Sequence, residues 1–158
     1  GALRNTAASH LAGKIPAMNN PRITAIVLLG LTSLVASHSV QATPLLRCEL
    51  SYAGASQSIE ATPVTDPYPV PSVDIGGRFR FKAVMVGTAL QFDRVVLYAY
   101  FDADADAGTQ PTLIQQVKYL PPFKASATPY PLTGEQRLYA GTAERELIYS
   151  CTLEGVQP

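Results

Sequence analysis

The chain contains 158 residues, which is enough for one domain or for one domain with a processed segment. Apolar residues make up 47% of it and charged residues 15%, a balance that excludes a wholly disordered chain. Twelve basic residues match twelve acidic ones, so the formal charge of zero gives no support for nucleic-acid binding, which relies on a basic surface.

The first part of the chain has the pattern of a targeting segment. Residues 1–17 follow no periodic pattern, and we expect them to form an unstructured extension upstream of Met18. Arg22 then precedes the uncharged apolar segment Ile23–Ala36. As a helix this segment would span about 21 Å, which is short of the ~30 Å hydrocarbon core of a bilayer. A basic residue followed by a short apolar run is typical of a secretory signal peptide.

Small residues mark a cleavage site behind the apolar run. Val40 and Ala42 stand at the −3 and −1 positions of a cut before Thr43. We therefore expect a signal-peptide helix within 18–42 and a single exported β-domain over 43–158. The compact signal favours the periplasm of a Gram-negative bacterium, or secretion, with membrane association only through an uncleaved signal segment.

The composition of the expected mature domain differs from that of the whole chain. All twelve acidic residues but only nine of the basic ones follow Thr43, which gives a net charge of −3. Both histidines, His10 and His38, precede the expected cut. Catalysis by Ser-His-Asp or Cys-His groups is therefore excluded for the mature domain, and imidazole ligation of a metal is excluded as well.

The two cysteines of the chain both lie in the expected domain. Residues alternate around them so that each thiol shares a strand face with apolar neighbours: Leu46, Leu50 and Tyr52 for Cys48, and Leu147, Tyr149 and Leu153 for Cys151. Exported proteins fold in oxidising compartments. We therefore predict a structural disulfide between Cys48 and Cys151.

The expected domain has strand patterns throughout and no sustained helical period. Strands are predicted for seven segments, namely Leu46–Tyr52, Gln57–Ala61, Arg78–Val86, Phe92–Phe101, Thr112–Leu120, Gln136–Ala140 and Glu144–Glu154. The first two and the last two segments are predicted to form hairpins. Residues 62–71, TPVTDPYPVP, contain four prolines and are predicted to be an extended segment that crosses between sheets.

These elements predict an all-β domain of about seven strands. The expected fold is an antiparallel β-sandwich, immunoglobulin-like in general architecture, or a small barrel. The spacing of Tyr149 and Cys151 resembles the tyrosine corner of immunoglobulin-type domains, which implies a sandwich of that general kind.

An acidic loop is the candidate metal site. Asp102, Asp104 and Asp106 occupy alternate positions before Gly108, and calcium prefers several oxygen ligands from such loops. The loop does not match an EF-hand, because its twelfth position is Leu113 and not glutamate. The alternative interpretation is a solvated loop that keeps one end of a sheet soluble.

A row of cations is the candidate binding site. Arg78, Arg80 and Lys82 share one strand face, with about 7 Å between successive residues. Such a row can bind an anionic partner. A solvent-facing strand beside carboxylates, or an edge strand protected by charge, has the same pattern.

The sequence contains no recognisable catalytic residues and no signal for a cofactor other than calcium. We expect a non-enzymatic exported module that binds or assists another envelope protein. One alternative is a small domain that binds calcium or another ligand through residues 102–108. The other alternative is a carboxylate hydrolase of envelope glycans, because two acidic residues suffice for that chemistry.

Overall fold

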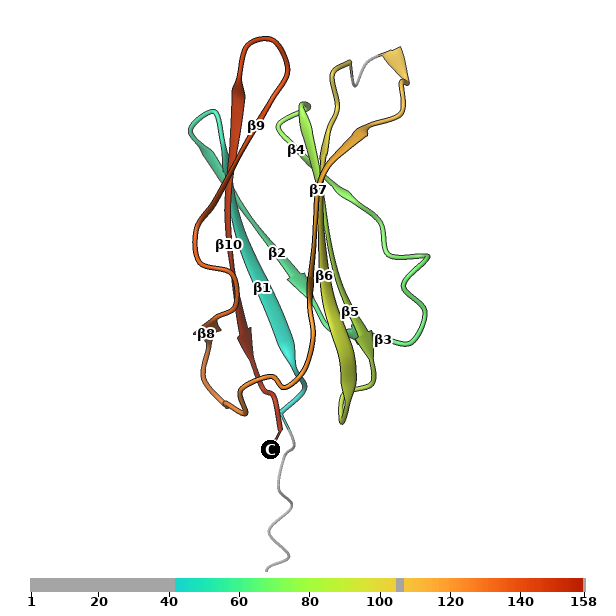
Figure 1. Cartoon of the computed structure of the whole chain (residues 1–158), viewed down its shortest axis with the longest axis vertical. Helices are drawn as coiled ribbons and strands as arrows, with labels where there is room; N and C mark the ends of the chain where they lie inside the picture. Colours follow the sequence, from blue (N-terminus) through green and yellow to red (C-terminus); the bar gives the residue numbers. More distant parts are fainter. Residues whose placement is uncertain (1–41, 105–106, 158) are drawn as a thin grey trace, which may run out of the picture. The chain divides into compact units, whose positions relative to one another are not determined.

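The computed structural model describes residues 42–104 and 107–157, which belong to a compact unit spanning Ser39–Pro158. These residues form ten strands in two sheets and contain no helix, so the all-β prediction is confirmed (Figure 1). Residues 1–17 and nearly all of the predicted signal peptide lie outside the described ranges. No helix in the described residues is long and apolar enough to cross a membrane.

The first sheet, called sheet A, contains both ends of the described chain. Its strands are β1 (Leu45–Tyr52), β2 (Ala55–Ala61), β8 (Tyr130–Pro131), β9 (Gln136–Ala140) and β10 (Arg145–Glu154). The order is β2-β1-β10-β8, and β9 also pairs with β10, with every pairing antiparallel. Because residues 147–149 pair with β1 and β9 at once, β9 lies on the edge of β10 opposite to β1.

The second sheet, called sheet B, consists of the middle of the chain. Its strands are β3 (Pro63–Val64), β4 (Val73–Ile75), β5 (Phe79–Gly87), β6 (Phe92–Phe101) and β7 (Thr112–Tyr119). The order is β3-β5-β6-β7, and β4 pairs with β5 near the start of that strand. The strand β6 is central, as its apolar character on both faces predicted.

Alternating side chains place one core between the two sheets. The largest fully buried side chains come from both sheets and are Tyr149, Phe79, Phe81, Leu46, Leu50, Met85, Leu97, Leu147, Leu153 and Val95. They form one cluster together with both cysteines. Since β1, β10 and the first half of β5 bury every second residue, the period of two seen in the sequence is the signature of this sandwich-like packing.

The proline-rich segment crosses between the sheets as predicted. Strand β2 ends at Ala61 in sheet A, and after Thr62 the chain enters sheet B as β3, which runs parallel to β5. The three shortest strands, β3, β4 and β8, were not predicted. Each has two or three residues, too few for an alternating pattern, and both β3 and β8 contain proline.

Both predicted hairpins are present. The two residues between β1 and β2, Ala53 and Gly54, have φ angles of 51° and 81°, as a two-residue turn of the twisted hairpin type requires. Four residues separate β9 from β10, and the amide of Glu144 donates to the carbonyl of Gly141 at 3.1 Å.

Candidate functional site

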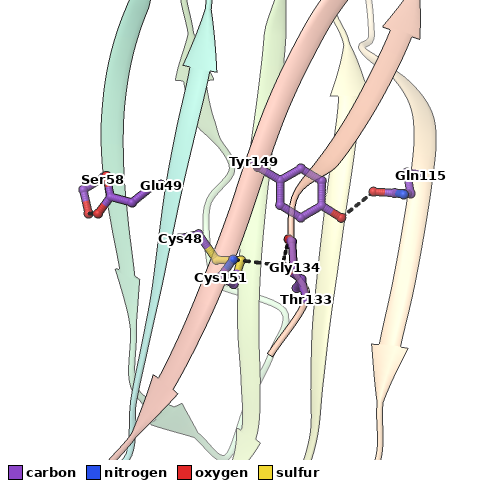
Figure 2. Close-up of a disulfide and its surroundings, with 8 residues drawn as sticks. All are labelled: Cys48, Glu49, Ser58, Gln115, Thr133, Gly134, Tyr149 and Cys151. Carbon is purple, nitrogen blue, oxygen red and sulfur yellow. Dashed lines mark hydrogen bonds between the residues drawn. A yellow bond between two sulfur atoms is a disulfide. The ribbon is translucent and has the colours of Figure 1, made fainter. Parts of the chain in front are cut away.

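The predicted disulfide is confirmed, and it joins neighbouring strands of one sheet. Cys48 and Cys151 are directly opposite in the pairing of β1 with β10, with their Cα atoms 4.0 Å apart (Figure 2). Both side chains are buried in the core. The conserved bridge of immunoglobulin domains instead links two sheets. The bridge here fixes the first long strand to the last one and has no exposed sulfur for chemistry.

Tyr149 connects the two sheets through a hydrogen bond. Its hydroxyl on β10 donates to Oε1 of Gln115 on β7 at 2.6 Å (Figure 2). Burial, with a smaller contribution from Tyr119, raises the pKa of Tyr149 to about 12. The hydroxyl of a tyrosine corner bonds to backbone a few residues upstream. The resemblance of Tyr149 and Cys151 to that motif therefore does not extend to the hydrogen bond.

The three predicted cations occupy one end of the outer face of sheet B. Arg80 and Lys82 alternate with Phe79 and Phe81, which are buried in the core, so the cations point away from it. Arg78 immediately precedes β5 and has the same parity. The spacing inferred from the sequence is therefore the spacing in the sheet.

Arg78 and Lys82 are held by neutral groups. Nη1 of Arg78 donates to the carbonyl of Ala103 at 2.8 Å, which ties β5 to the acidic loop. Nζ of Lys82 donates to the carbonyl of Pro67 at 3.3 Å and lies 5.9 Å from the ring centre of Tyr98. Both side chains are partly buried, yet neither forms a salt bridge with a carboxylate of residues 42–104 or 107–157.

Arg80 makes the same kind of contact with the end of the proline-rich segment. Its Nε donates to Oγ of Ser72 at 2.9 Å, and its Nη2 donates to the Ser72 carbonyl at 3.3 Å. Asp74 is the cross-strand partner of Arg80 but forms no ion pair with it. The Asp74 carboxylate instead accepts the amide of Gly77 at 3.0 Å. The three cations thus brace loops through neutral acceptors and form no salt bridge with any carboxylate in the described part of the chain.

Two more cations and two aromatic rings complete this surface. The register places five cations on the outer side of sheet B, which we call the basic face: Arg78, Arg80, Lys82, Arg94 and Lys118. The rings of Tyr98 and Tyr100 lie 6.3 Å apart and nearly parallel on the same side. Both rings were missed in the sequence analysis, because β6 is apolar on both faces from Val95 onwards. Without an alternation of polar and apolar residues, the sequence does not mark the outer side of this strand.

The outer side of sheet A has the opposite character. Its carboxylates are Glu49, Glu60, Glu135, Glu146 and Glu154, and its cations are Arg47 and Arg137. Every salt bridge among the described residues lies here: one joins Arg47 to Glu60 at 2.8 Å, and the others join Arg137 to two glutamates. The domain therefore has one acidic side with paired charges and one basic side without ion pairs.

The two described carboxylates of the acidic loop differ in their exposure to solvent. Asp102 is 4% exposed, and its Oδ1 has no hydrogen-bond partner. Asp104 is exposed, and its backbone carbonyl accepts from Thr109 at 3.2 Å. Asp106 lies outside the described residues. Within the described ranges, no three side chains of the metal-ligating types come together.

Two carboxylates that could act in hydrolysis share one cation on sheet A. Glu135 and Glu146 both bind Arg137 on sheet A. Hydrogen bonds from Tyr139 and Arg137 lower the pKa of Glu146. A general acid needs the opposite shift, which comes from burial in an apolar environment. This carboxylate pair therefore has the electrostatics of a surface ion-pair network.

Comparisons with known proteins give no relative from which a role could be transferred. No family model matches the chain, and neither the curated proteins nor the solved structures contain a significant match. The candidate sites therefore depend on geometry and chemistry alone.

Proposed function

We propose that this protein is a non-enzymatic exported module that binds an acidic surface of another envelope protein through the basic face. One observation carries the proposal. Arg78, Arg80 and Lys82 are held side by side by neutral acceptors, whereas Arg47 and Arg137 on the outer side of sheet A form salt bridges with glutamates. An uncompensated row of cations attracts an acidic partner and fixes its orientation.

The cations are also pre-organised for binding. Each is already restrained by a hydrogen bond to a loop, so less side-chain entropy is lost when a partner docks. The loop that Lys82 restrains presents Tyr68, whose side chain is 90% exposed. Its amide donates to Oδ1 of Asp66 at 3.0 Å, which shapes the turn. Tyrosine and arginine are the residue types that dominate binding energy at protein interfaces.

The compartment follows from two features together. The buried disulfide is consistent with an oxidising environment, and the pattern of residues 18–42 indicates export. A periplasmic or secreted location is therefore part of the proposal.

The proposal is tested by removing charge while keeping hydrogen-bond donors. In the variant Arg78→Gln, Arg80→Gln, Lys82→Gln, each amide can still donate to a loop carbonyl. The wild-type protein and this variant are immobilised, incubated with envelope extract from the source cells, and the crosslinked partners identified by mass spectrometry. We expect an acidic partner that binds the wild type and binds the variant at least about tenfold more weakly, with affinity that falls as salt rises.

A matched control removes cations from the other side. Arg47→Gln with Arg137→Gln changes net charge in the same direction but leaves the basic face intact. The control should retain the partner. If the triple variant and the control recover the same partners at equal strength, the basic face is not the binding site.

Calcium binding by the acidic loop is the second candidate function. The observation that favours it is Oδ1 of Asp102, which is buried with no hydrogen-bond partner among the described residues, in a loop that also contains Asp104. A cation would satisfy that oxygen. Calorimetric titration should then show calcium binding that Asp102→Asn abolishes, and the absence of heat at millimolar calcium excludes this function.

A further inference from the structure

Two leucines stand exposed at the same end of the sandwich. Leu90 lies in the turn between β5 and β6 and is 71% exposed, and Leu120 follows β7 and is 63% exposed. The β5–β6 hairpin and the chain after β7 both reach the end of the domain where β1 begins (Figure 1). Most large apolar side chains of the domain are buried, so two leucines exposed together mark a contact surface.

Apolar groups continue between the two loops. A depression of about 230 Å³ has an apolar lining of Leu90, Phe92, Pro121, Pro122 and Phe123, together with Pro44, Ala89 and Val156, and a polar lining of Gln91, Asp93 and Gln157. The rings of Phe92 and Phe123 stack within this lining with centroids 4.6 Å apart. The packed rings give the two loops a firm apolar base from which the leucines project.

Three cations lie near this end, two on the outer side of sheet B and one beside β8 of sheet A. Arg94 pairs with Val86 next to the β5–β6 turn, and Lys118 precedes Leu120 by two residues. Lys124 follows the second loop and lies 5.6 Å from the ring of Tyr130. None of the three cations takes part in a salt bridge among the described residues.

Three carboxylates lie near this end of the domain, and one of them, Glu60, forms a salt bridge with Arg47. Asp93 is exposed beside Arg94 and lines the depression. Glu154 lies at the corresponding end of sheet A and acts on Arg47, whose pKa it helps to raise. On the side of sheet B, cations therefore outnumber carboxylates.

We propose that this end of the domain docks peripherally on a bilayer containing anionic lipids. Exposed leucines on adjacent loops insert into the boundary between headgroups and acyl chains, and basic residues around them bind the lipid phosphates. In this arrangement the two leucines are the deepest contacts, and the phosphates are bound by Arg94, Lys118 and Lys124. Arg94 and Lys118 also belong to the basic face, whereas Leu90 and Leu120 lie outside it, so the two leucines distinguish membrane contact from binding of the acidic partner.

The test measures sedimentation of the disulfide-bonded protein with vesicles. Vesicles of phosphatidylglycerol in phosphatidylcholine are compared with vesicles of phosphatidylcholine alone, in low and high salt. The wild type should bind the anionic vesicles more tightly, and high salt should weaken this binding. The variant Leu90→Ser with Leu120→Ser should bind at least about tenfold more weakly. Because both side chains are exposed, the variant is expected to fold, which circular dichroism checks.

Leu113→Ser is the matched control. Leu113 is 47% exposed at the opposite end of β7, so its replacement should leave vesicle binding unchanged. The triple glutamine variant of the basic face should also retain binding, which separates this inference from the protein-partner proposal. Equal vesicle binding by the wild type and the Leu90/Leu120 variant would overturn the membrane-docking inference. The absence of binding to any vesicle would overturn it as well. The second result would favour an apolar protein partner at this end.

Discussion

Removal of the bridge between Cys48 and Cys151 should destabilise the domain strongly. The perturbation is the variant Cys48→Ala with Cys151→Ala, which replaces two buried side chains and cuts the covalent link between β1 and β10. All backbone hydrogen bonds of the pairing remain available, because Cys48 and Cys151 are ordinary cross-strand neighbours in it.

The magnitude follows from the length of chain that the bridge encloses. The two cysteines are separated by 103 positions, so the unfolded chain gains nearly the full freedom of the domain when the link is cut. In the chain-entropy model a loop of this length corresponds to about 4.7 kcal/mol at 25 °C. Domains of this size unfold with about 5–15 kcal/mol, so the loss is a third or more of the total. At about 4 °C per kcal/mol, the melting temperature should fall by about 15–20 °C.

The assay is urea unfolding followed by circular dichroism, with calorimetry for the melting temperature. Reduced wild-type protein is the companion sample, because it lacks the link but keeps both sulfur atoms. We expect both proteins to lose most of the 4.7 kcal/mol and to show a larger urea dependence, since an unlinked unfolded chain exposes more surface. A loss below about 2 kcal/mol in both proteins would refute the reasoning. A loss confined to the alanine variant would assign the effect to packing.

Three further substitutions test the hydrogen bond between the sheets and the packing at a glycine. Tyr149→Phe removes the bond to Gln115 and should lower the unfolding free energy by about 1–2 kcal/mol in urea at neutral pH. The pKa of Tyr149 in the folded protein is raised to about 12, so this residue stabilises the fold fully below pH 10 and progressively less as the pH rises towards 12. Between pH 10 and 12 the unfolding free energy of the variant should therefore fall less than that of the wild type. Gly87→Ala places a Cβ 2.4 Å from the Cα of Phe92 and should lower the unfolding free energy by more than about 2 kcal/mol. At Gly54 no atom lies within 4 Å of the added Cβ, so Gly54→Ala should lower it by only about 1 kcal/mol. Equal losses for the two variants would contradict the packing argument.

Much of the fold was predictable because burial alternates along each strand. The pattern around Phe79 and Phe81 predicted β5 and the side on which Arg80 and Lys82 lie. Four prolines in residues 62–71 predicted an extended segment, and the structure confirms that it crosses between sheets. The disulfide was predictable for a different reason: the chain has only two cysteines, each with apolar neighbours on its strand face.

The candidate sites were predictable only where their residues are close in sequence. Arg78, Arg80 and Lys82 were found as a row within one strand. The rings of Tyr98 and Tyr100 beside them were not, because the register of β5 against β6 places them there. The sequence pattern also did not show that Asp102 is buried, since alternation of acidic residues predicts a solvated loop.

By itself, the sequence determined the seven longer strands, which side of the alternating ones faces the core, and that the two cysteines can pair. These are local properties, encoded in a period of two along the chain. Only the tertiary structure decided that the bridge lies within one sheet, that cations of three strands share a face, and that Leu90 and Leu120 project from one end. Those facts depend on strand order and register between distant segments, which no local pattern specifies.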